Sequence, residues 1–125
     1  MNKNFTQING HQFYEGLVAG IKNLLDYKNK LDEINVFPVP DGDTGTNMCF
    51  TLLPIVEECK DLITDNINET MNIIADLALE SARGNSGTII AQFLHGFRKS
   101  TEGKDLLEIG DISQALVQGF KSSKE

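Results

Sequence analysis

The chain has 125 residues, a length that suits one domain with a modest core. Its hydrophobic content of 40% and charged content of 23% are typical of globular proteins and exclude a disordered or collagen-like chain. The 18 acidic residues outnumber the 11 Lys and Arg residues and give a formal charge of -7, which argues against broad binding to nucleic acid or anionic lipid. A small anion would need local donors, such as helix N-termini, backbone amides or bound cations.

Nothing in the sequence favours export or membrane insertion. No apolar run approaches the length of a membrane span, and the polar start MNKNFTQING lacks the apolar core of a secretory signal. If Cys49 and Cys59 lie on one helix, they are separated by roughly 15 Å of rise, beyond the reach of a disulfide. These features predict a cytoplasmic protein with reduced thiols.

The spacing of apolar residues predicts about five helices. Residues 11–31 are expected to form one amphipathic helix. Two prolines in the following EINVFPVPDGDTGTNM segment end that helix and stiffen a loop. The remaining helices are predicted over 47–63 with a candidate kink at Pro54, over 68–82, from about Ser86, and from a capping-box pattern at Asp111 to Gln114.

No stretch alternates with period two, so the predicted fold class is all-α, with antiparallel helices where connections are short. Residues 1–125 are expected to form a single domain. Because the last predicted helix begins close to the end of the chain, we expect the core to be completed by something outside this sequence.

The first motif that can carry chemistry is the loop after the two prolines. Asp41 and Asp43 are two residues apart in an extended segment, so both carboxylates can point the same way and form a hard-cation site. Gly42 and Gly45 allow positive φ and close approach of the backbone to a ligand. A simple interhelical turn rich in turn-forming residues is the alternative. A calcium EF-hand loop is excluded, because counting from Asp41 places Thr46 where the invariant glycine should be.

The second motif is ARGNSGT at residues 82–88, a glycine-bounded turn that leads into a helix. Free N–H groups and the positive end of the helix dipole suit a phosphate, with the Ser86 and Thr88 hydroxyls as further donors. The alternative is a plain helix connection capped by Ser86. Arg83 is the only basic side chain next to either motif, and it could contact a phosphate or form a surface ion pair.

Together the two motifs supply what a metal–nucleotide site requires, which is oxygen ligands for dications and a cradle for an anion. With few lysines nearby, magnesium would supply most of the neutralising charge. Neither a GxxxxGK[ST] nor a GxGxxG motif occurs. His11 and His95 are expected to be surface or interface residues, and no Ser/His/Asp or Cys/His pattern supports covalent catalysis.

The segment NVFPVPDGDTGTNM, followed later by ARGNSGTIIAQFLHGF, resembles the nucleotide-binding domain of the DhaL-like kinases. The likeness is greatest to the N-terminal domain of bacterial fatty acid kinase, and it extends more weakly over GHQFYEGLVAGIKNLL. The resemblance implies an all-α barrel of antiparallel helices that binds ATP with two magnesium ions. Since the family domain is longer, this chain is similar to its N-terminal portion.

The resemblance also implies roles for individual residues. Asp41 and Asp43 would be the catalytic magnesium ligands. Asn35, which stands where the dihydroxyacetone-kinase branch has a third aspartate, would be a further metal ligand. The nucleotide phosphates would be bound by two turns, comprising Thr44, Gly45, Thr46 and Asn47 in the first and Asn85 and Ser86 in the second.

The implied reaction is transfer of the ATP γ-phosphoryl to a fatty acid carboxylate that a lipid-binding partner protein presents. Dihydroxyacetone held by another subunit is the alternative acceptor. A non-catalytic helical interaction module or a nucleotide sensor is a different class of function that the same loops could serve. We expect little or no turnover from this chain alone, and a homo-oligomer could complete the barrel.

Overall fold

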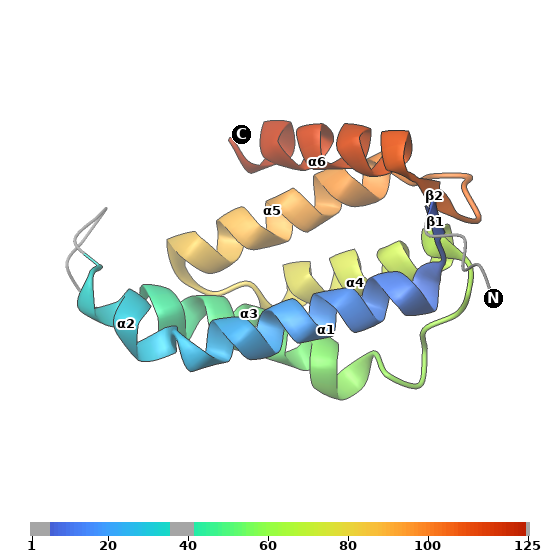
Figure 1. Ribbon diagram of the computed structural model, residues 1–125. Coiled ribbons are helices and arrows are strands. Elements are labelled where there is room, and N and C mark those ends of the chain that lie inside the picture. Colours follow the sequence, from blue (N-terminus) through green and yellow to red (C-terminus); the bar gives the residue numbers. More distant parts are fainter. Residues whose placement is uncertain (1–5, 36–41, 125) are drawn as a thin grey trace.

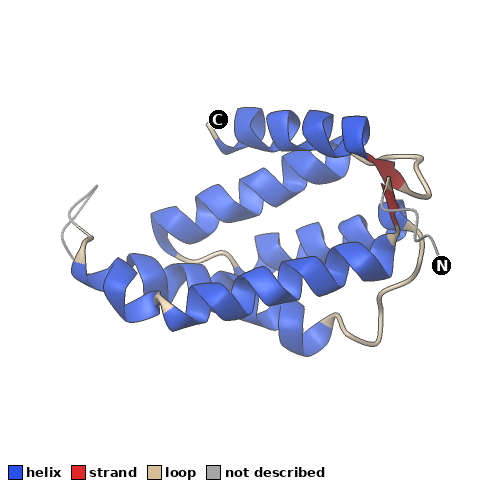
Figure 2. Ribbon diagram, viewed as in Figure 1, coloured by secondary structure: helices blue, strands red, loops and turns tan. Residues whose placement is uncertain are grey.

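The computed structural model describes residues 6–35 and 42–124. Most of these residues are helical, so the expected all-α class is confirmed (Figure 1, Figure 2). They form β1 (Gln7–Ile8), α1 (Gly10–Asp26), α2 (Lys28–Glu33), α3 (Thr44–Glu58), α4 (Ile67–Ser81), α5 (Gly84–Ser100), β2 (Leu107–Glu108) and α6 (Ile109–Ser123).

Helices α1, α3, α4, α5 and α6 run in alternating directions along the chain (Figure 1). Helices α1, α3 and α4 lie together, α5 packs on α3 and α4, and α6 packs on the far side of α5. At one end β1 and β2 form a short antiparallel pair in which Gln7 faces Glu108. The opposite end contains α2 and the first turns of α3 and α5, so the described residues of both predicted motifs belong to that end.

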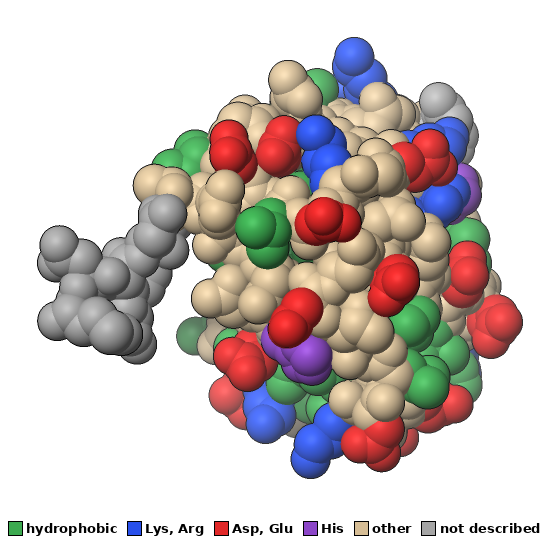
Figure 3. Space-filling model, turned by 90° about the vertical axis from the view of Figure 1, so that its right-hand side faces the viewer, with side chains coloured by type: hydrophobic (Ala, Val, Ile, Leu, Met, Phe, Trp, Pro, Cys, Tyr) green, Lys and Arg blue, Asp and Glu red, His purple; other side chains and the backbone are tan. Residues whose placement is uncertain are grey.

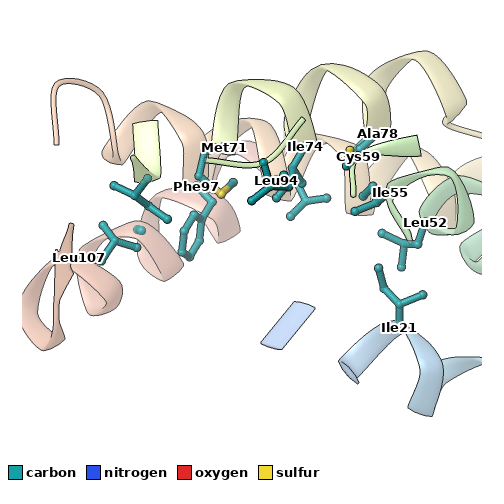
Figure 4. Packing of buried hydrophobic residues seen from close by; sticks show 14 residues of the cluster. Ile21, Leu52, Ile55, Cys59, Met71, Ile74, Ala78, Leu94, Phe97 and Leu107 are labelled. Atoms are coloured by element: carbon teal, nitrogen blue, oxygen red, sulfur yellow. The ribbon is translucent and has the colours of Figure 1, made fainter. Parts of the chain in front are cut away.

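An apolar cluster joins α1, α3, α4, α5, α6 and β2 (Figure 4). Its centre consists of fully buried side chains from successive helices, among them Ile55 of α3 and Met71 and Ile74 of α4. Both cysteines are buried and free, as expected for reduced thiols. Within the described ranges, no helix is long and apolar enough to cross a membrane.

The prediction of one helix over residues 11–31 is wrong. Helix α1 ends at Asp26, and Tyr27 joins it to the separate short helix α2. The Tyr27 N–H bonds to the carbonyl of Leu24, a tightened last turn that changes the direction of the chain. The break allows α2 to pack against α3, a tertiary contact that apolar spacing along the chain does not encode.

The other helix boundaries differ from the predictions by smaller amounts. The helix predicted over 47–63 begins earlier, at Thr44, ends at Glu58 and continues through Pro54. The capping box predicted to begin at Asp111 is wrong, because Glu108 is the N-cap and Asp111 is the third helical residue. Pairing of β2 with β1 extends the chain up to Glu108 and fixes this start.

The surface combines a general negative charge with an apolar groove. Acidic side chains are spread over the face shown in Figure 3, in keeping with the formal charge of -7. A groove of about 440 Å³ lies between α1, α3, α5 and α6 and is lined largely by apolar side chains, including Leu24, Met48, Ile89, Phe93 and Phe120.

Candidate functional site

The structure describes two of the three predicted metal ligands, Asn35 and Asp43. Asp41 lies outside the described residues. The N–H of Asp43 donates a hydrogen bond to Oδ1 of Asn35 at 3.1 Å. Asp43 is the half-buried N-cap of α3, and its carboxylate makes no capping hydrogen bond to the described part of that helix. Asn35 therefore holds the backbone of Asp43, whose carboxylate is not occupied in capping.

Sequence reasoning missed Asp32, which lies in the last turn of α2. Its carboxylate accepts hydrogen bonds from the N–H of Thr46 at 2.9 Å and from the Thr46 hydroxyl at 2.7 Å. Nζ of Lys28 lies 3.3 Å from the same carboxylate. The bonds from Thr46, assisted by Lys28, lower the pKa of Asp32 from its usual value. The only sequence signal is a carboxylate near a helix C-terminus, where the dipole disfavours negative charge.

The second turn lies directly against the first. Oγ of Ser86 donates to the carbonyl oxygen of Thr44 at 3.1 Å, so this hydroxyl links two helices and does not cap α5. The N–H of Arg83 donates to the Thr51 hydroxyl at 3.1 Å. That hydroxyl in turn donates to the carbonyl of Asn47 at 2.8 Å. The two motifs, separated in sequence by α4, form one surface.

Glycine is required where the two turns meet. Gly84 has a φ of +69°, and a Cβ at this position would collide with the buried side chain of Asn47. A Cβ on Gly87 would collide with the hydroxyl of Thr51. On the other side of α3, a Cβ on Gly45 would meet the backbone of α2. These glycines let three backbone segments approach closely. The Asn47 side chain lies directly against Gly84, at the start of the second turn.

The two helix N-termini differ in what is already bound to them. The first turn of α3 has the Asp32 carboxylate on its Thr46 amide. Helix α5 has no side-chain capping bond within the described residues, and Gly84 and Asn85 at its start are exposed. Because free N–H groups and the dipole attract anions, the start of α5 is the better anion-binding position of the two.

Arg83 lies beside the exposed start of α5. Its guanidinium is stacked over the ring of Phe50, with 4.6 Å between the guanidinium carbon and the ring centroid. This cation–π contact is neither of the two arrangements that the sequence suggested. It keeps a positive charge at the edge of the surface formed by the two turns.

The residues present are compatible with magnesium bound together with phosphates. Within the described ranges, no group of three or more His, Cys, Asp or Glu side chains forms a metal cluster. Magnesium does not need such a cluster, since it is usually held by one or two carboxylates plus phosphate oxygens and water. Asp43 supplies a carboxylate of this kind. His11 contributes nothing here, because it is exposed and pairs with Asp65 at 2.6 Å.

Comparison with known proteins agrees with these motifs. The DAK2 domain matches residues 38–125. Protein YloV of Bacillus subtilis is 38% identical over 112 residues, covering 90% of this chain and 20% of that protein. An uncharacterized protein of Staphylococcus epidermidis is 36% identical over 118 residues, covering 94% of this chain and 21% of that protein. An uncharacterized protein of Staphylococcus aureus is 37% identical over 120 residues, with coverages of 96% and 21%.

The chain thus spans about a fifth of the length of these curated relatives. The family match covers most of the chain and includes both turns. The resemblance drawn from the two sequence motifs is thereby confirmed. The chain belongs to the DAK2 domain family, the ATP-binding domain family of the DhaL-like kinases.

Proposed function

We propose that residues 1–125 act as a single domain that binds ATP with Mg²⁺ in a cytoplasmic phosphotransferase similar to fatty acid kinase. The family membership supports nucleotide binding. In this proposal Asp41 and Asp43 are the metal ligands, and Asn35 orients the second of them through the bond to its N–H. Bound Mg²⁺ would supply the positive charge that offsets the triphosphate in an acidic protein.

The observation that carries the proposal is the contact between the first turns of α3 and α5. The Ser86 hydroxyl bonds to the Thr44 carbonyl, and Asp43 immediately precedes Thr44. A carboxylate for a cation and an exposed helix N-terminus for an anion therefore share one surface. The phosphate-binding set proposed for this surface is Thr44, Gly45, Thr46, Asn47, Asn85 and Ser86.

The proposed reaction moves the γ-phosphoryl group of ATP to the carboxylate of a fatty acid, giving ADP and an acyl phosphate. Such a transfer depends mainly on positioning and charge stabilisation. The fatty acid would be presented by a separate lipid-binding protein. This part rests on the similarity of NVFPVPDGDTGTNM to the fatty acid kinase branch. Since the chain spans about a fifth of its relatives, we expect little acyl phosphate from this chain alone.

The test is thermal unfolding with ATP, Mg²⁺, both or neither. We expect a rise in the unfolding midpoint that requires both ligands, because a ligand that binds only the native state stabilises it. Asp43→Asn and Asp41→Asn should each remove most of the rise. Asp61→Asn is the matched control, since it removes one exposed acidic charge beyond the far end of α3.

Two results would count against the proposed nucleotide site. One is a midpoint that does not respond to ATP with Mg²⁺, which would favour a helical interaction module. The other is an equal rise of the unfolding midpoint in Asp43→Asn and in the wild type, which would mean that the ligand binds away from the start of α3.

A further inference from the structure

The side chain of Asp32 connects α2 to α3 beside the proposed site. One carboxylate oxygen accepts the N–H of Thr46 at 2.9 Å, and the other accepts its hydroxyl at 2.7 Å. The second oxygen also lies 3.3 Å from Nζ of Lys28. Both oxygens of Asp32 are therefore engaged within the protein.

Two neighbouring contacts act on the same short stretch of α3. Oδ1 of Asn35 accepts the N–H of Asp43 at 3.1 Å. Gly45 packs so closely on the backbone carbonyl of Lys28 that a side chain would not fit. From Asp43 to Thr46, three of four consecutive residues are thus fixed by residues 28–35.

This arrangement suits positioning better than metal binding by Asp32 itself. A carboxylate that accepts hydrogen bonds from an amide, a hydroxyl and an ammonium group has little capacity left to coordinate a cation. Its partner Thr46 lies three residues after Asp43 and within the first turn of α3. Partners of this kind, one bond removed from metal or phosphate ligands, fix the orientation of those ligands.

We propose that Asp32 is a positioning residue for the metal–nucleotide site, which it serves by fixing the first turn of α3 through Thr46 so that Asp43 and the adjacent amides are held in place. This inference rests on the proposed function. It adds a residue that does not touch the ligand but controls the affinity for it.

The fold offers a matched control in Asp111. Its carboxylate also accepts a backbone N–H, from Glu108 at 2.9 Å, and lies 3.1 Å from a lysine, Lys104. The side chains of Asp32 and Asp111 are 17% and 24% exposed, and those of the two lysines are each 37% exposed. Asp111 lies at the start of α6, at the end of the molecule occupied by β1 and β2 (Figure 1).

The experiment measures the dissociation constant of ATP at saturating Mg²⁺ by calorimetry, at a temperature where every variant is folded, together with the unfolding midpoint. We expect Asp32→Asn to weaken ATP binding about 10-fold or more, the usual effect of removing such a partner. Asp111→Asn should lower the unfolding midpoint by a similar amount and leave the dissociation constant at the wild-type value.

Equal affinities in Asp32→Asn and Asp111→Asn would overturn the positioning role and leave the proposed function intact. Absence of ATP binding in the wild type would overturn both. If Asp32→Asn does not fold, Asp32→Glu replaces it and Asp111→Glu is its control: weaker ATP binding by Asp32→Glu than by Asp111→Glu supports the role, and equal binding overturns it.

Discussion

Gly84 is the residue where the two turns depend most on the absence of a side chain. Its φ of +69° disfavours any L-residue, and a Cβ there would collide with Asn47. Gly103 has a similar φ of +75° but open space around it. Comparing a substitution at Gly84 with one at Gly103 therefore separates the cost of a positive φ from the cost of steric overlap.

We expect Gly84→Ala to lower the free energy of unfolding more than Gly103→Ala does, by about 1–3 kcal/mol, the usual range for overpacking. Both substitutions incur the cost of a positive φ, and only the first forces Asn47 to move. Urea denaturation of the two variants measures the difference. Equal losses would mean that Asn47 shifts without cost.

His95 gives the molecule a predictable response to pH. It is half-buried on α5, and its Nδ1 is buried without a hydrogen-bond partner in the described part of the chain. Burial lowers the pKa of His95 below its usual 6.5, and the nearby Arg98 and Lys99 lower it further, against a smaller opposite effect of Asp76. The unfolded chain therefore takes up the proton at a higher pH than the native protein.

This difference makes protonation favour unfolding. His95 has no effect well above its unfolded pKa, and stability is lost as the pH falls below that value. Between about pH 7.5 and 5.5, a window around the ordinary histidine pKa, the unfolding midpoint of the wild type should fall more than that of His95→Gln. Thermal unfolding across this range measures both slopes, and parallel slopes would contradict the assignment.

At the scale of elements, the sequence predicted a helix correctly where capping residues close in sequence set its ends. The expected 68–82 and the observed Ile67–Ser81 nearly coincide, because Asn66 caps the helix by accepting the N–H of Glu69. The break at Tyr27 was not predictable, since no glycine or proline marks it and packing of α2 on α3 determines it. The start of α6 was misplaced because the pairing of β2 with β1 determines it.

The site was predictable to a similar degree. The types of residue in both motifs indicated binding of a metal and of phosphate. Their spacing along the chain could not show that the two turns are in contact. Their contact depends on α4 returning the chain to the start of α3, a tertiary event. The role of Asp32 was not predicted, because its hydrogen bond to Thr46 joins residues 14 positions apart and belongs to no local pattern. The roles assigned to Asp41, Asp43 and the phosphate-binding residues stay predictions.

At the scale of the whole molecule, the apolar groove stands out on an acidic surface. Phe120 is 61% exposed and contacts Phe93 edge-on, with 5.6 Å between the ring centroids. Ile89 of α5, another residue of the groove lining, is 51% exposed. An open apolar surface of this kind usually meets another molecule or segment.

We expect the native protein to bind an uncharged hydrophobic dye such as Nile red in this groove. Phe120→Ser should reduce the dye fluorescence, because it removes the largest exposed ring of the lining. Leu79→Ser, which changes a 45% exposed leucine of α4 outside the groove, should leave it unchanged. Fluorescence titration under native conditions measures both, and an equal reduction in the two variants would contradict binding at the groove.

The bond between Ser86 and Thr44 joins residues 42 positions apart. The surface formed by this contact is therefore lost when α3, α4 and α5 separate. No pair of consecutive helices can maintain it without the third. A molecule held there would tie these helices into one cooperative unit. Amide protons deep in α4, which faces no ligand, would then exchange with solvent more slowly when the surface is filled, because exchange would require all three helices to open at once.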